Sequence, residues 1–323
     1  MLLDPAAEVS GIPDFSAYSD RIIGEIKGSE QGPIVIALTG MHGNEPSGIE
    51  ALSYIFNKFS KLDHQFNGYL IGLKANLAAL DQKCRFIDED MNRIWFTSII
   101  DKIKRAPEDY LTSSERRETK VILNIIEPLM TLAQETGRLL IFADLHTFSA
   151  EEGMFTVSVR DEKNIDLLSQ LHVPLIFGIE RALHGTALKY MQNMGAIAFA
   201  LESGKHFSKA AEDNAKAGLI LLLTAAGCIH ASDIPDFARY YDYMLEQNAQ
   251  LPHKVEFVYR HIIEKDEEFV MRPGFKNFDK VSKGDWLAND CCGKIHAQND
   301  GYILMPLYQE QGNEGFFIVK PID

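Results

Sequence analysis

The sequence predicts an α/β fold, with a mixed, mostly parallel sheet covered by helices on both faces, followed by a small all-β, barrel-like domain. Over residues 1–250, short and almost continuously apolar runs alternate with helical patterns. Strands that helices cover on both sides have this apolar character, and the alternation is typical of α/β sheets. Residues 251–323 contain short segments of alternating polarity separated by glycine and proline, which indicates an antiparallel β domain. We therefore predict two domains, at 1–250 and 251–323.

Each predicted strand of the first domain is a short apolar run that ends in polar residues at a turn. The runs occupy residues 33–40, 68–76, 139–146, 173–180 and 196–204. Helical patterns lie at residues 46–59, 113–135, 164–171 and 209–228. Pro46 suits the first turn of a helix, where a missing N–H group removes no intrahelical bond. The second domain takes its strands from segments such as VEFVYRHIIEK, GYILMPLY and GFFIVKP.

Composition and charge narrow the classes of partner. Hydrophobic residues make up 46% of the 323 residues and charged residues 24%, which is the balance of an ordinary globular protein. The net charge of −14 repels phosphate groups, so we expect neither nucleic acid nor an anionic membrane as a partner. No apolar run reaches the roughly 20 residues of a membrane helix, and the N-terminus does not resemble a signal peptide. No CxxC pair is present, so reduced thiols in a cytoplasmic protein are expected for Cys84, Cys228, Cys291 and Cys292.

Metal-capable and acidic residues stand where three of the predicted strands end. His42 and Glu45 follow the first run, Asp144 and His146 close the third, and Glu202 closes the fifth. Ligands of an open α/β sheet bind beyond the carboxyl ends of its strands. Two imidazoles and one carboxylate are the ligand set of a catalytic zinc site that keeps one position open. Each residue alone is more often structural, so spacing by itself leaves a metal site and a set of structural side chains equally open.

Four segments carry a resemblance to a known family. GMHGNE, DEDMNRIW, ADLHT and ALESG, in this order, resemble the succinylglutamate desuccinylase/aspartoacylase family of the zinc carboxypeptidase-like superfamily. The stretch VSKGDWLANDCCGKIHAQNDGYILMP is similar to the C-terminal β domain of that family. The resemblance implies a zinc-dependent hydrolase with one Zn²⁺ ion. It would cleave the amide bond of a small N-acylated amino acid or related compound.

The resemblance also implies roles for individual residues. It places the zinc ligands at His42, Glu45 and His146, and the general base at Glu202. Asp144 matches a carboxylate that accepts the other N–H group of a ligating imidazole and so orients it.

Four further positions match residues that act on the substrate. Asn92 and Arg93 match a substrate-binding pair, and Tyr190 matches another substrate-binding residue. Arg85 matches an arginine that polarises the scissile carbonyl group or binds a carboxylate. The alternative for Arg85 is an exposed salt bridge of little energetic weight.

The sequence departs from the family pattern just before the fifth strand. Related deacylases commonly carry an arginine there for a substrate carboxylate, and this chain has Asn193. Either the substrate lacks that carboxylate, or Arg160 or Arg181 replaces the missing cation. Glu151 and Glu152 would repel a dianionic acyl group if they face the site, and otherwise they are solvated surface charges. The acyl group is therefore left open.

Two other functions compete with a deacylase. A metallocarboxypeptidase acting on short peptides would share the ligands and the base but need an open groove, and the C-terminal domain is expected to narrow access. A non-catalytic zinc-binding protein that kept the fold is the second alternative. Lys294 does not lie in the tight hairpin of a biotinyl or lipoyl carrier, so we interpret it as a surface lysine. The sequence does not decide between a monomer and a homo-oligomer.

Overall fold

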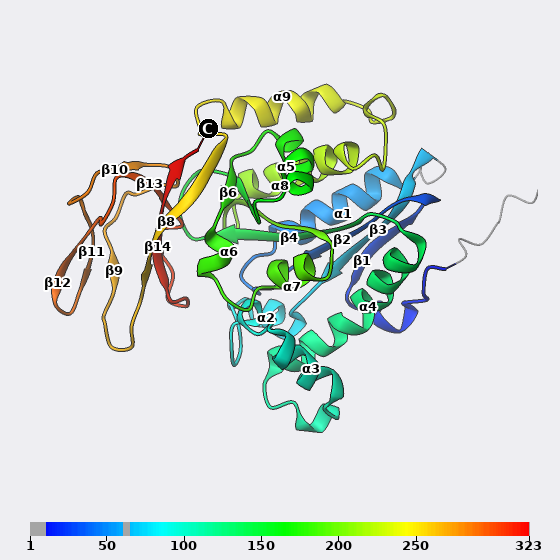
Figure 1. The fold of residues 1–323 in the computed structure, drawn as a ribbon, viewed down its shortest axis with the longest axis horizontal. Helices are drawn as coiled ribbons and strands as arrows, with labels where there is room; N and C mark the ends of the chain where they lie inside the picture. The colour runs from blue at the N-terminus through cyan, green and yellow to red at the C-terminus, as the bar shows by residue number, and fades with distance from the viewer. Residues whose placement is uncertain (1–10, 61–64, 323) are drawn as a thin grey trace, which may run out of the picture.

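The computed structural model describes residues 11–60 and 65–322. Figure 1 shows a central sheet between two layers of helices, with the C-terminal strands extending from one end of that sheet. The predicted fold class is confirmed.

One continuous sheet runs through the protein in the order β1-β3-β2-β4-β7-β5-β6-β8-β14-β13-β10. The strands β3, β2, β4 and β7 are parallel, and so are β5, β6 and β8. β1 and β5 run antiparallel to their neighbours β3 and β7. The bounds are β1 Ile22–Lys27, β2 Ser29–Thr39, β3 Asn67–Lys74, β4 Leu140–Phe148, β5 Phe155–Ser158, β6 Leu175–Phe177, β7 Ile197–Lys205 and β8 Lys254–Ile262.

Helices cover both faces of the sheet because its strands are apolar on both faces. In β2, Ile34, Ile36 and Leu38 belong to the core shared with α4 and α7, whereas Val35 and Ala37 belong to the core shared with α1 and α8. This alternation is the two-residue period of a strand. On the first side lie α3 Thr97–Arg105, α4 Ser114–Thr136, α6 Ile179–Ala182 and α7 Ala187–Asn193. On the second side lie α1 Ser47–Phe59, α5 Glu162–Leu168, α8 Lys209–Ala225 and α9 Phe237–Asn248.

The remaining helical segments are short. α2 spans Leu77–Gln82. Single 3-10 turns occupy Ser16–Tyr18, Met91–Arg93, Glu108–Tyr110, Ser169–Leu171 and Ala231–Asp233. Within the described residues, no helix combines the length and the apolar character needed to cross a membrane.

The C-terminal strands pack around a core of their own, four of them as the end of the central sheet and three as a separate small sheet. β8 pairs with β14 Glu314–Pro321, which pairs with β13 Gly301–Leu304, and that strand pairs with β10 Lys280–Val281. β9 Val270–Met271, β11 Trp286–Asp290 and β12 Gly293–His296 form the second sheet. Because β8 also pairs with β6, the C-terminal region continues the central sheet. The division of the chain at residue 250 therefore stays a prediction.

The elements that the sequence did not predict are short or weakly patterned. β1, β5, α2, α3, α7 and α9 fall outside the expected runs, and α6 occupies the end of the run expected as a strand at 173–180. The strand expected at 173–180 is only β6, Leu175–Phe177, because Gly178 has a positive φ of 88° and begins α6. A glycine readily adopts this conformation, so it can end a strand abruptly.

Candidate metal centre and pocket

The turn between β2 and α1 holds His42 and Glu45 inside the protein. It packs so closely on α2 that a Cβ atom on Gly43 would lie 2.0 Å from the Ala79 backbone. His42 and Glu45 are only 4% and 2% exposed. On the neighbouring strand β4, His146 is 5% exposed. A polar turn at the end of a buried strand thus delivers its side chains into the interior.

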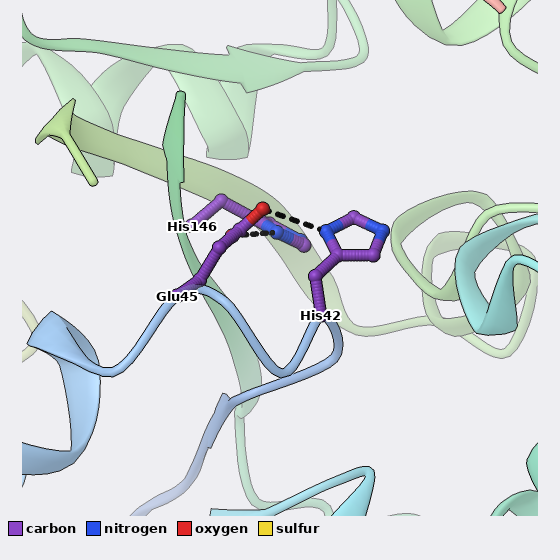
Figure 2. Close-up of side chains that lie close together, drawn as sticks. All are labelled: His42, Glu45 and His146. Atoms are coloured by element: carbon purple, nitrogen blue, oxygen red, sulfur yellow. Dashed lines mark hydrogen bonds and ion pairs between the residues drawn. The ribbon is translucent and has the colours of Figure 1, made fainter. Parts of the chain in front are cut away.

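The three side chains converge on one point (Figure 2). The Glu45 carboxylate lies between the two imidazoles, with 2.8 Å from Oε1 to His42 Nδ1 and 3.0 Å from Oε2 to His146 Nδ1. One donor atom from each residue lies within 4.8 Å of the other two. These residues form a candidate metal-binding group, and they are the three that the sequence predicts as ligands.

The far nitrogen of each imidazole faces another carboxylate. His42 Nε2 lies 3.1 Å from Asp90 Oδ1, and His146 Nε2 lies 2.9 Å from Asp144 Oδ2. A histidine that binds a metal usually donates its other N–H group to such a partner, which sets the tautomer and the ring orientation. Both imidazoles therefore present Nδ1 to a common point, and this arrangement fits a metal ion.

Electrostatics at this point favour positive charge. Burial by itself raises the pKa of Glu45, but the two imidazoles outweigh that effect and hold it well below its usual range. The pKa of Asp90 is also well below its usual range, because His42 and Arg85 outweigh burial. For His146, burial lowers the pKa, but Asp144 and Glu45 raise it well above the ordinary value. The carboxylates thus stabilise a cation between them.

Glu202 stands beside the metal-binding group on the adjacent strand. In the β4–β7 ladder it is the direct partner of His146. Burial is the main cause that raises the pKa of Glu202 to about 8, and the nearby Glu45 and Asp144 act in the same direction. Its Oε2 atom is shielded from solvent and has no hydrogen-bond partner among the described residues. A carboxyl group in this state can accept and return a proton near neutral pH.

A pocket of about 120 Å³ opens over these residues. Its walls include most of the site residues expected from the sequence, together with residues of α6, β5 and the C-terminal region. The expected residues that line it are His42, Glu45, Arg85, Asn92, Arg93, Asp144, His146 and Glu202.

The two arginines in the pocket are already paired with acidic side chains. Arg85 Nη2 lies 3.1 Å from Asp90, and Arg93 Nη2 lies 2.9 Å from Glu314. The Arg85 side chain is only 12% exposed, which excludes the surface salt bridge considered from the sequence. Its Nε atom is buried and has no partner among the described residues. Asn92 Oδ1 accepts a hydrogen bond of 3.0 Å from the Ala187 backbone N–H group.

Tyr190 does not line this pocket. It is 6% exposed and packs its ring against Trp95, with 5.6 Å between the ring centroids. The structure gives its predicted contact with substrate no support.

The expected replacements for the missing arginine also lie elsewhere. Asn193 is exposed at the end of α7 and does not line the pocket. The side chains of Arg160 and Arg181 are 54% and 66% exposed, and both pair with Glu256. The structure gives the idea that either arginine substitutes in the site no support, because both are exposed and neither lines the pocket.

The two acidic residues after His146 are surface charges. Glu151 and Glu152 form ion pairs with Lys205 and Lys276, and both carboxylate side chains are more than half exposed. Glu151 and Glu152 are therefore solvated surface charges and do not face the site.

Sequence reasoning missed two kinds of functional residue. Asp90 lies in the acidic stretch DEDMNR, where nothing distinguishes it from its neighbours. Gln309 and Gln311 belong to the C-terminal region: Gln309 accepts a 3.0 Å hydrogen bond from Asn44, and Gln311 accepts one of 3.0 Å from the Arg85 backbone. Only the folded chain brings these residues to the site.

The family assignment follows from a comparison with family models. The model for the succinylglutamate desuccinylase/aspartoacylase catalytic domain matches residues 31–225. The chain belongs to this family. The match contains the candidate metal-binding group and Glu202, and it confirms the resemblance inferred from the motifs. No curated protein sequence matches significantly.

Solved structures show the same fold at low sequence identity. A succinylglutamate desuccinylase/aspartoacylase from Rhodobacter sphaeroides is 14% identical, with a TM-score of 0.67 over 93% of this chain and 88% of that one. A succinylglutamate desuccinylase from Vibrio parahaemolyticus is 18% identical, with a TM-score of 0.62 over 92% and 84%. The ectoine utilization protein EutE (DoeB) from Ruegeria pomeroyi is 16% identical, with a TM-score of 0.62 over 92% and 87%.

Proposed function

We propose that this family member is a zinc-dependent deacylase that hydrolyses the amide bond of a small N-acylated amino acid or related compound. The observation that carries the proposal is the position of Glu202. Its unpartnered carboxyl oxygen lines the same pocket as the His42–Glu45–His146 group. A proton acceptor beside a metal-binding group is the arrangement that metal-assisted hydrolysis needs.

His42, Glu45 and His146 would hold the zinc ion, and Asp90 and Asp144 would orient the two imidazoles. When bound, zinc lowers the pKa of a bound water molecule to about 7 and polarises the carbonyl group of an amide. Cobalt or nickel would fit the same ligands, so the choice of zinc rests on the family and on the ligand set.

Glu202 supplies the proton transfers in this mechanism. Its carboxylate takes a proton from the attacking water molecule as the new C–O bond forms. The same proton then moves to the nitrogen of the departing amine as the C–N bond breaks. The high pKa that burial produces suits a group that must both accept and return a proton.

The arginines would position the substrate. The unpartnered Nε–H group of Arg85 is a donor available to the carbonyl oxygen or to a carboxylate of the substrate. Arg93, with Asn92 beside it, lines the same pocket and would hold the amino-acid half of the substrate.

The size of the pocket argues against the carboxypeptidase alternative. Its volume of about 120 Å³ is below the roughly 300–1,000 Å³ of pockets for drug-sized ligands. Residues 305–314 of the C-terminal region supply part of its wall, which leaves less room for a peptide. The second alternative, a non-catalytic zinc-binding protein, would bind zinc but hydrolyse no substrate, and the following experiment tests for this difference.

The test combines metal content with turnover. Zinc-loaded protein is assayed against N-acetyl, N-succinyl and N-formyl amino acids, beside Glu202→Gln and the exposed control Glu152→Gln. We expect turnover of one acyl class, a loss of about 10²–10⁴-fold in Glu202→Gln, and unchanged zinc content. Full turnover in Glu202→Gln, or no zinc in the parent protein, would contradict the proposal.

A further inference from the structure

Glu180 places a further carboxylate in the pocket, outside the metal-binding group, and one of its oxygens has no hydrogen-bond partner among the described residues. It lies on α6, is 8% exposed and lines the pocket wall. Its Oε2 atom is buried without a hydrogen-bond partner among the described residues. Oε1 forms an ion pair with Arg181, at 3.4 Å from its Nε atom. A buried carboxylate oxygen that lacks a donor is unfavourable, and a ligand with an N–H donor would satisfy it.

The arginines around the pocket are shared with other carboxylates. Among the described residues that line it, the arginines are Arg85 and Arg93, which pair with Asp90 and Glu314. Arg181, the cation near Glu180, has a side chain that is 66% exposed and binds Glu256 at 3.0 Å. The buried Oε2 atom of Glu180 is therefore left without a donor, and a cationic N–H group of the ligand would supply one.

Part of the pocket wall beside the carboxyl groups of Glu202 and Glu180 is apolar. Ala200 lies two residues before Glu202 on the same face of β7, about 7 Å along the strand. It pairs directly with Val157 of β5, and both line the pocket, as does Ile179 next to Glu180. A substrate with its amide at Glu202 would lay a short aliphatic chain across this wall.

We propose that the substrate carries an ammonium group on a short aliphatic side chain, and that Glu180 binds this group. The inference rests on the proposed deacylase function, and it names the class of substrate as an N-acylated diamino acid. Glu180 would then determine specificity, with Ala200 and Val157 contacting the methylene groups.

The experiment measures binding, so that it does not depend on turnover. Zinc-loaded Glu202→Gln protein is titrated by calorimetry with Nα-acetylornithine, N-acetylnorleucine and N-acetylglutamate. Acetylnorleucine replaces the ammonium group by a methyl group of similar size, and acetylglutamate reverses the charge. We expect acetylornithine to bind about tenfold to a hundredfold more tightly than acetylnorleucine, with acetylglutamate the weakest, since a charge-assisted hydrogen bond gives a difference of this order.

Variants then assign the preference to Glu180. Adding Glu180→Gln, which keeps the shape and removes the charge, should abolish the advantage of acetylornithine, whereas Glu180→Asp should retain part of it. Glu256→Gln is the matched control, because it removes one charge near Arg181 but lies outside the pocket. It should leave the ranking unchanged.

Three outcomes overturn the inference. The first is that acetylnorleucine or acetylglutamate binds as tightly as acetylornithine, and the second is that no probe binds. The third is an acetylornithine preference that survives in Glu180→Gln. If Glu180→Gln fails to fold, the ranking in the parent protein still decides. Hydrolysis by the wild-type enzyme is scored separately: turnover of uncharged or acidic substrates would keep the deacylase and reject the ammonium site. Selective binding of acetylornithine without hydrolysis of any probe would keep the ammonium site and reject the deacylase.

Discussion

The two regions that build the pocket differ in how firmly the structure holds them. The metal-binding group stands at the ends of β2 and β4, with Glu202 on β7, and its ligands make several contacts each with buried partners. Residues 305–314, between β13 and β14, reach the pocket from the C-terminal region and attach through the amide groups of Gln309 and Gln311. The sheet thus carries the candidate metal ligands and Glu202, and the C-terminal segment forms part of the pocket wall.

This division has a physical basis. Adjacent strands hold their side chains in a register that the whole ladder enforces, as it does for His146 and Glu202. A connecting segment on the surface tolerates change far more readily and commonly carries specificity. Changes in the first region should therefore affect metal binding and turnover, and changes in the second should affect substrate affinity.

The largest expected effect is loss of a ligand from the sheet. His146→Ala should reduce zinc content from about one ion per chain to nearly none and lower turnover by at least about 10³-fold. Metal analysis after gel filtration and an activity assay measure both. Exposed His296→Ala, in the C-terminal region, is the control and should keep zinc and activity. Stoichiometric zinc in His146→Ala would show that the ligand set is wrong.

A smaller effect is expected from the carboxylate that orients His42. Asp90→Asn should weaken zinc binding by about 10–100-fold, because the imidazole loses its charged partner. Competition with a chelator measures the affinity. Exposed Asp81→Asn on α2 serves as the matched control. An unchanged affinity in Asp90→Asn would place this aspartate outside the metal site.

A change in the C-terminal segment should act on substrate affinity alone. Gln309→Ala removes a hydrogen bond from Asn44 and a 3.0 Å contact with His206 Nε2. We expect KM to rise about 2–10-fold with kcat and zinc content nearly unchanged, since each such bond contributes about 0.5–1.5 kcal/mol. Gln298→Ala is the exposed control in the same region. A fall in kcat with KM unchanged would remove the distinction between the two regions.

The smallest effect concerns stability outside both regions. Burial raises the pKa of Glu89, but hydrogen bonds from Arg116 and Ser113 outweigh it and lower the pKa below its ordinary 4.5. A lowered pKa in the folded protein contributes stability above the unfolded value, which is lost as pH falls through the folded value.

Glu89→Gln should therefore lower the free energy of unfolding above about pH 5, by less than about 1 kcal/mol because the pair is partly exposed. The difference from wild type should shrink below about pH 4. Urea titrations at both pH values measure it. A difference that grows in acid would have the wrong sign for this ion pair.

Much of the site was predictable because its residues stand in local patterns. The motifs that contain His42, Glu45, His146 and Glu202 each follow or end an apolar run, and the strand-end rule places them at one edge of a sheet. Asp90 was not predictable in this way, since an aspartate in an acidic loop has the same local pattern whether it is solvated or buried. Its buried partners are Arg85, from the same loop, and His42, from a distant segment of the chain.

By itself, the sequence determined the α/β class, the family and the residues that can bind a metal ion. These depend on local periodicity and on short motifs, which the chain carries wherever it folds. The tertiary structure decided that Tyr190 lies in the core, that Arg160 and Arg181 lie at the surface, and that Glu180 and residues 305–314 line the pocket. Each of these positions results from contacts between segments far apart in the chain, and no local pattern specifies such contacts.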